Sequence, residues 1–246
     1  MSELKRGIGF MEASPGLRPQ GRCRMKGIGK KTVLWVAGAA VLLVGAGAWG
    51  EVLGRTTGPL DARDARTVES TLGNLVADAA RSAVGAKVAV VQASQFRAQA
   101  IAAGDVTRET LTGALLYPDE RIVLVELTGA QLQAAVERSV SMLPKPSTGF
   151  LQVSGFAVNF RSTESSGARV TEMRVDGEVI APAKTYRAAM PASLAKGTLG
   201  YFRIFDGLKV QETGPAIADA VCDYVRAMRT ISPATGRLRD LSKPSS

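Results

Sequence analysis

The sequence predicts an α/β domain built on a mixed sheet. Along the chain, apolar residues switch between three- and four-residue spacing, typical of helices, and short continuous runs, typical of buried strands. In the middle of the chain several strands follow one another without a helix between them, which argues against a purely parallel sheet. Hydrophobic residues make up 46% of the 246 residues and charged residues 22%, so one domain with a sizeable core is expected.

Helices and strands alternate in the first half of the expected domain. Each helix is predicted from its apolar spacing and each strand from a short apolar run. Thr128 and Gln131 have the spacing of a capping box, which predicts the start of a helix. The expected elements are a helix at 69–83, a strand at 87–91, a short helix at 107–115 capped by Thr107, a strand at 122–127 and the helix after Thr128.

The second half predicts three strands and a final helix. The strands are expected at 150–160, 169–175 and 185–190. The pair Asp176-Gly177 predicts a hairpin turn between the last two. Gly214-Pro215 is expected to start the final helix, in which Cys222 lies among apolar residues and is interpreted as a core residue.

The N-terminal part predicts three segments outside the folded domain. An uncharged apolar stretch follows Lys30 and Lys31, and as a helix it would span about 27 Å, close to a bilayer core of roughly 30 Å. Transmembrane anchor and cleaved signal peptide both remain open, and either places the domain outside the cytoplasm. The expected segments are a disordered basic region 1–31, the anchor or signal 32–49, a linker 50–65, the domain 66–241 and a tail 242–246.

Charge and histidine content exclude several functions. The net charge is +9, but eight basic and only two acidic residues lie within 1–31, so the folded part lacks the basic stripe of a nucleic-acid binder. The chain has no histidine, which excludes histidine-dependent metallohydrolase and serine or cysteine–histidine hydrolase chemistry for the chain alone. Ser193 and Lys196 have the S-x-x-K spacing of penicillin-binding enzymes, but the other motifs of that class do not follow.

Several longer motifs follow one another in a fixed order. They are ESTLGNLVADA from Glu69, GDVT from Gly104, VELTGAQL from Val125, ERSVS from Glu137, FLQVSG from Phe150 and GTLGY from Gly197. In this order they resemble the C-terminal, substrate-binding domain of bacterial 5′-nucleotidases, here without the metallophosphatase domain. The resemblance implies a layered α/β/β/α fold, and it implies neither a cofactor nor a metal site in this part.

The resemblance also implies six ligand-binding residues and no catalytic residue. Phe150 and Tyr201 correspond to the two aromatics that stack on the nucleobase, and Arg66 and Arg97 to arginines near the phosphate. The remaining two are Gln92, where the family has asparagine, and Asp206, which could hold ribose hydroxyls. The alternatives are that the aromatics only pack the core and that the arginines are surface charges.

Three functions follow as expectations. The first is an extracytoplasmic, non-catalytic domain that binds a nucleotide or nucleotide-like small molecule. The second is a substrate-binding subunit that works with a separate metallophosphatase chain. The third is a structural or interaction domain that has lost the ligand. A membrane contact is expected through the N-terminal helix, and no nucleic acid is expected as a partner.

Overall fold

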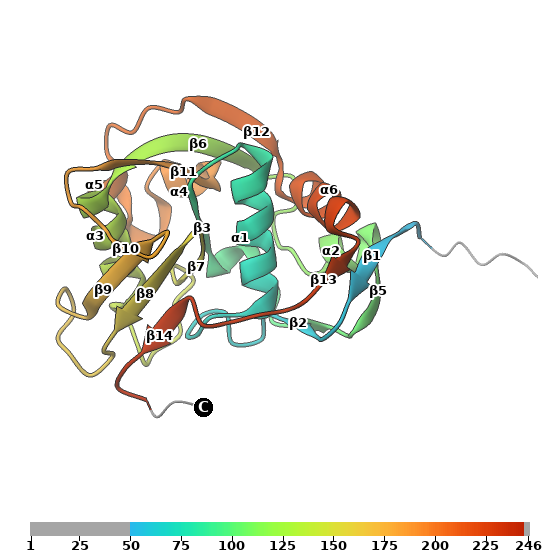
Figure 1. Ribbon diagram of the computed structural model, residues 1–246, viewed down its shortest axis with the longest axis horizontal. Coiled ribbons are helices and arrows are strands. Elements are labelled where there is room, and N and C mark those ends of the chain that lie inside the picture. Colours follow the sequence, from blue (N-terminus) through green and yellow to red (C-terminus); the bar gives the residue numbers. More distant parts are fainter. Residues whose placement is uncertain (1–49, 244–246) are drawn as a thin grey trace, which may run out of the picture. The chain divides into compact units, whose positions relative to one another are not determined.

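The computed structural model describes residues 50–243, and a five-stranded mixed sheet forms its centre (Figure 1). The strand order is β12-β6-β11-β3-β7, and within this sheet only β11 and β3 pair in parallel. This arrangement confirms the expected α/β class with a mixed sheet. The strands are β3 (Val88–Gln92), β6 (Arg121–Thr128), β7 (Leu151–Ser154), β11 (Thr185–Pro191) and β12 (Glu212–Ala216).

Helices cover this sheet, and their starts follow the expected caps. Helix α1 packs on β3 and β7 and against α6 (Figure 1). Thr107 and Thr128 each form a capping box, so both expected helix starts are confirmed. The helices are α1 (Thr71–Ala83), α2 (Arg108–Gly113), α3 (Gly129–Val140), α4 (Ala192–Ala195), α5 (Phe202–Phe205) and α6 (Ile217–Met228), with short 3-10 turns η1 (Ala93–Gln95) and η2 (Thr198–Gly200).

A second, four-stranded sheet has the order β10-β9-β8-β14. Gly155, with φ of 80°, divides the expected strand 150–160 between the two sheets. Asp176 and Gly177 both have positive φ, which suits a tight hairpin turn, but this turn joins β9 to β10 instead of β11. The strands are β8 (Phe156–Phe160), β9 (Val170–Val175), β10 (Glu178–Val179) and β14 (Leu238–Asp240).

The expected linker 50–65 is wrong, because this segment belongs to the fold. Its strand β1 pairs with β5 and β13, and its strand β2 pairs with β4. Leu60 is fully buried. Three of these strands have only two residues each, and β1, which reads VLGRT, shows neither an apolar run nor apolar alternation. They are β1 (Val52–Thr56), β2 (Leu60–Asp61), β4 (Ala100–Ile101), β5 (Gly104–Thr107) and β13 (Thr230–Ile231).

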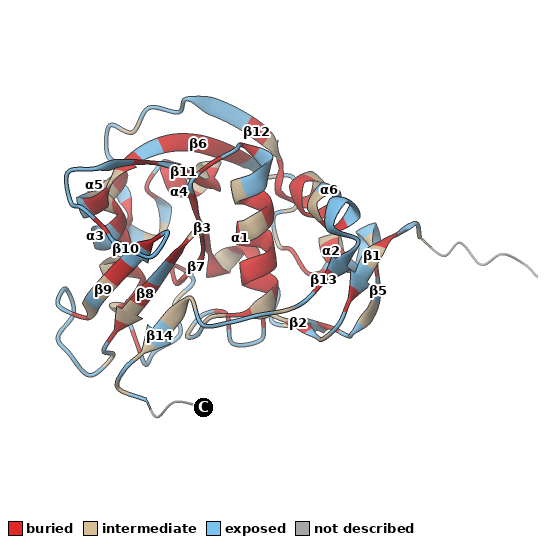
Figure 2. Cartoon of the chain, viewed as in Figure 1, coloured by how far each residue is buried: buried red, intermediate tan, exposed pale blue. Residues whose placement is uncertain are grey.

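The final helix begins later than expected. Gly214 and Pro215 lie in β12, and α6 starts at Ile217. Proline is tolerated there because β12 is an edge strand of its sheet. Cys222, on α6, is buried in the core as expected, and burial raises the pKa of its thiol. Figure 2 shows that α6 has one buried face and one exposed face.

Within residues 50–243 no helix is long and apolar enough to span a membrane. The expected anchor or signal 32–49, the basic segment 1–31 and the last residues of the expected tail lie outside the described residues.

Candidate functional site

Tyr201 is completely buried beside the segment that carries Phe150. Its exposed fraction is 0%, and its hydroxyl donates a 2.6 Å hydrogen bond to the carbonyl oxygen of Gly149. The ring stacks on Phe205 with centroids 5.5 Å apart. Burial raises the pKa of the Tyr201 phenol, which keeps the hydroxyl protonated as a donor. Tyr201 is therefore a satisfied core residue in this structure.

Arg138 holds the loop in front of Tyr201. Its guanidinium donates a 2.8 Å hydrogen bond to the carbonyl oxygen of Leu199 and lies 5.8 Å from the centre of the Tyr201 ring. Leu199 has φ of 58°, an uncommon conformation for a residue with a branched side chain, and it packs against the core. The loop thus has specific contacts that keep Tyr201 turned inward.

Phe150 is also buried, with an exposed fraction of 1%. Its carbonyl oxygen accepts a hydrogen bond from the backbone N–H of Ala93, and the residue lies at the edge of a hollow of about 660 Å³ that Thr67 also lines. Tyr201 does not line this hollow. A stacked nucleobase needs an exposed face on each ring, and neither ring offers one here.

Two of the polar residues expected at the site lie beside the same segment. The backbone carbonyl of Arg66 accepts a 2.9 Å hydrogen bond from Ser147, and the Arg66 side chain is exposed. Gln92 is buried and pairs with Leu151 across β3 and β7. The structure therefore brings Arg66, Gln92, Phe150 and Tyr201 to one region. Their role in ligand binding stays a prediction.

Arg97 and Asp206 have other contacts. Arg97 is exposed, and its backbone N–H donates to the carbonyl of Ala114 after α2. Asp206 is exposed after α5 and lines a groove with Phe202. Within residues 50–243 neither makes a hydrogen bond or ion pair with the segment around Phe150.

The sequence did not reveal a polar cluster behind Gln92. The Gln92 amide donates a 3.2 Å hydrogen bond to the Ser193 hydroxyl, while Glu120 accepts hydrogen bonds from the Ser193 backbone and from the Gln95 amide. Both glutamine side-chain oxygens are buried without a partner among the described residues. Lys196 is exposed, and no described contact joins it to Ser193, so the S-x-x-K pair is not assembled as a nucleophile with its base.

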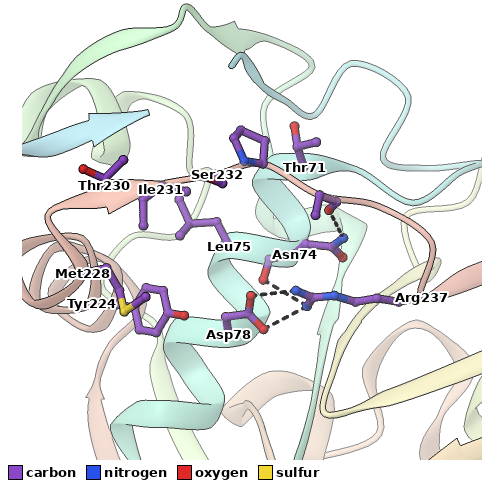
Figure 3. Close-up of a pocket in the computed structure, with 12 residues that line it drawn as sticks. Thr71, Asn74, Leu75, Asp78, Tyr224, Met228, Thr230, Ile231, Ser232 and Arg237 are labelled. Atoms are coloured by element: carbon purple, nitrogen blue, oxygen red, sulfur yellow. Dashed lines mark hydrogen bonds and ion pairs between the residues drawn. The ribbon is translucent and has the colours of Figure 1, made fainter. Parts of the chain in front are cut away.

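A further cavity of about 270 Å³ lies between α1 and the C-terminal segment and contains none of the six expected site residues (Figure 3). Asp78 and Arg237 form an ion pair with oxygen and nitrogen 2.7 Å apart at its edge. Asn74 lines it one helical turn before Asp78. Asn74 and Asp78, four residues apart in an otherwise largely apolar helix, are the sequence signal that could have indicated this cavity. Within residues 50–243 no cluster of acidic and cysteine side chains could hold a metal.

The chain is similar to proteins named as 5′-nucleotidases, 5′-nucleotidase-related proteins and apyrases. It is 30% identical over 210 residues to a 5′-nucleotidase-related protein of Glossina morsitans morsitans, covering 76% of this chain and 38% of that protein. It is 30% identical over 191 residues to an apyrase of Anopheles gambiae, covering 74% and 33%. A 5′-nucleotidase precursor of Thermus thermophilus has a similar structure, with a TM-score of 0.70, 25% identity and coverage of 79% and 40%.

The chain thus spans between a third and two fifths of the length of these relatives. The profile that matches residues 52–207 is that of the 5′-nucleotidase C-terminal domain. This match begins at β1, in agreement with the strands found where a linker was expected. The chain belongs to the 5′-nucleotidase C-terminal domain family.

Proposed function

We propose that this chain is a non-catalytic interaction domain in which Tyr201 fills the place that a nucleobase would take. The hydrogen bond from the Tyr201 hydroxyl to Gly149 carries this proposal, because it fixes the ring against the residue before Phe150. A nucleobase could enter between Phe150 and Tyr201, here called the base slot, only if this hydrogen bond and the stack on Phe205 were broken. The absence of histidine from the chain supports a function without hydrolysis.

Calorimetric titration of the full chain with AMP and with adenosine tests this proposal. We expect no saturable binding of either, which corresponds to a dissociation constant above about 1 mM. The chain alone should also release no phosphate from AMP when Mg²⁺, Mn²⁺ or Zn²⁺ is added. Micromolar binding of AMP or adenosine would contradict the proposal that Tyr201 occupies the place of the nucleobase.

A nucleotide-like ligand between Phe150 and Tyr201 is the second candidate. The position of Arg66 and Gln92 beside the Phe150 segment favours it. In this candidate Tyr201 turns away from Gly149 when the ligand enters, and AMP binds more tightly than adenosine because arginines hold its phosphate. Phe150→Ala should then weaken binding by about 1–3 kcal/mol. Equal affinities for AMP and adenosine would show that the arginines do not bind the phosphate.

A substrate-binding subunit for a separate metallophosphatase chain requires the same open slot, because such a subunit lends its pocket to the partner. This alternative predicts that the two chains co-purify and that AMP hydrolysis appears only when both are present. It fails together with the second candidate if Tyr201 keeps the slot closed in the mixture.

We also propose that the domain lies outside the cytoplasm. The uncharged stretch 32–49 directly after Lys30 and Lys31 supports this, because flanking positive charge stays on the cytoplasmic side. Protease added to intact spheroplasts should therefore degrade the domain while a cytoplasmic marker survives. Protection of both would place the domain inside. The mass of the purified mature chain separates an anchor from a cleaved signal.

A further inference from the structure

A groove of about 610 Å³ lies along α5, on the side of the sheet where β12 and β6 pair. Two glycines shape it. Gly197 has φ of 81°, and a Cβ there would lie 2.3 Å from the Cα of Phe202, so α4 and α5 approach closely only with glycine at this position. Gly207 has φ of 71° and follows the end of α5. The backbone on both sides of α5 therefore has a conformation that favours glycine, and it sets the position of α5 beside the groove.

The groove has an apolar wall with exposed large side chains. Phe205 and Val123 form its buried part. Phe202 and Val210 line it with exposed fractions of 59% and 50%. A concave surface that combines buried and exposed apolar side chains is typical of ligand sites, and its volume lies within the range of small-molecule pockets.

Unpaired positive charge borders this apolar wall. Arg121 begins β6, next to the strand end that leads into α4, and Lys196 follows α4, so the two cations come from adjacent elements. Both are exposed, and within residues 50–243 neither has an ion-pair partner. The guanidinium of Arg203 lies 5.6 Å from the centre of the Phe202 ring, which adds a third cation near the groove. Asp206, which also lines the groove, is the acidic residue in this set.

We propose that this groove binds an anionic amphiphile, with a hydrocarbon chain against Phe202 and Val210 and a carboxylate at Arg121 and Lys196. Binding removes apolar surface of the hydrocarbon chain and of the groove from water, which favours the complex. Hydrogen bonds from the two cations favour an anionic headgroup over a neutral one. This inference goes beyond the proposed interaction domain and does not depend on the base slot, because neither Phe150 nor Tyr201 lines the groove.

Binding of dodecanoate and dodecanol to the full chain, below their aggregation limits, tests the proposal. The two probes share the hydrocarbon chain and differ in the charge of the headgroup. We expect dodecanoate to bind with one-to-one stoichiometry and dodecanol about tenfold more weakly. The apolar stretch 32–49 is the same in every variant, so any uptake of a probe by it cancels when a variant is compared with the native chain.

Two variants and two matched controls locate the site. Phe202→Ala should weaken both probes about tenfold, while the double variant Arg121→Gln with Lys196→Gln should weaken dodecanoate about tenfold and leave dodecanol unchanged. Tyr117→Ala, at another exposed aromatic, and Lys145→Gln, at another exposed lysine, should have no effect.

The proposal is overturned if dodecanoate does not saturate, or if Phe202→Ala binds it as tightly as the native chain. Equal affinity for the two probes, or an unchanged affinity in the double variant, would overturn the anionic selectivity. Thermal unfolding of each variant verifies that these exposed substitutions leave the fold intact. Val210→Ser replaces Phe202→Ala if the latter unfolds.

Discussion

Replacing Glu69 with glutamine is expected to lower the free energy of unfolding by about 3 kcal/mol. The Glu69 carboxylate accepts hydrogen bonds from the backbone N–H groups of Gly236, Arg237 and Leu238 and from the side-chain amide of Asn74. Glutamine would present a donor where an acceptor is required, so at least one backbone N–H would lose its partner. Together with the ion pair between Asp78 and Arg237, this carboxylate attaches the C-terminal segment that leads into β14 to α1.

Thermal unfolding checks this prediction. For a domain of this size we expect the midpoint to fall by roughly 6–12 °C. Glu178→Gln, at an exposed position on β10, serves as the matched control and should change the midpoint by less than about 2 °C. Amide hydrogen exchange in Leu238–Asp240 should become faster in the Glu69 variant only. Equal midpoints for the two variants would show that the carboxylate does not anchor the segment.

Replacing Gly155 with alanine is expected to destabilise the domain by at least about 3 kcal/mol. Gly155 lies between β7 and β8 with φ of 80°, a conformation that residues with a Cβ rarely adopt. A Cβ at this position would also lie 2.3 Å from the carbonyl oxygen of Lys87. Because the obstacle is backbone next to β3, a side-chain rotation cannot relieve the contact.

Gly177→Ala separates the two causes. Gly177 has the same φ of 80°, but a Cβ there would meet nothing within 4 Å. Its variant should lose only about 1–2 kcal/mol, the cost of the left-handed conformation. Chemical denaturation of both variants measures the difference. Losses of equal size would mean that the chain between β7 and β8 can move away from Lys87.

The sequence was sufficient for elements with strong local signals. Helix α3 has a capping box at Thr128 and amphipathic spacing, and strands β3 and β6 are apolar runs, so each was predicted within a few residues. Strand β2 has only two residues, and β1 reads VLGRT, which has no apolar run and no alternation. Long-range pairing with β4, β5 and β13 holds both strands in the fold. For this reason the sequence suggested a linker.

The packing of the candidate site could not be predicted from the sequence. The resemblance implied one ligand site made of Arg66, Gln92, Arg97, Phe150, Tyr201 and Asp206. Contacts with the segment around Phe150 join Arg66, Gln92 and Tyr201 to it, and the role of all six residues in ligand binding stays a prediction. Whether a tyrosine hydroxyl finds a buried acceptor depends on the backbone of a distant segment, which a sequence does not reveal. The polar cluster behind Gln92 could not be predicted for the same reason. Glu120 accepts hydrogen bonds from Ser193 and Gln95, which lie far from it along the chain.

A crystal structure of the full chain grown with excess AMP would show whether Tyr201 keeps the space beside Phe150 closed to a base. We expect the Tyr201 hydroxyl to remain within hydrogen-bonding distance of the Gly149 carbonyl, with no base beside Phe150. An adenine ring stacked between Phe150 and Tyr201, with the tyrosine turned away from Gly149, would contradict it.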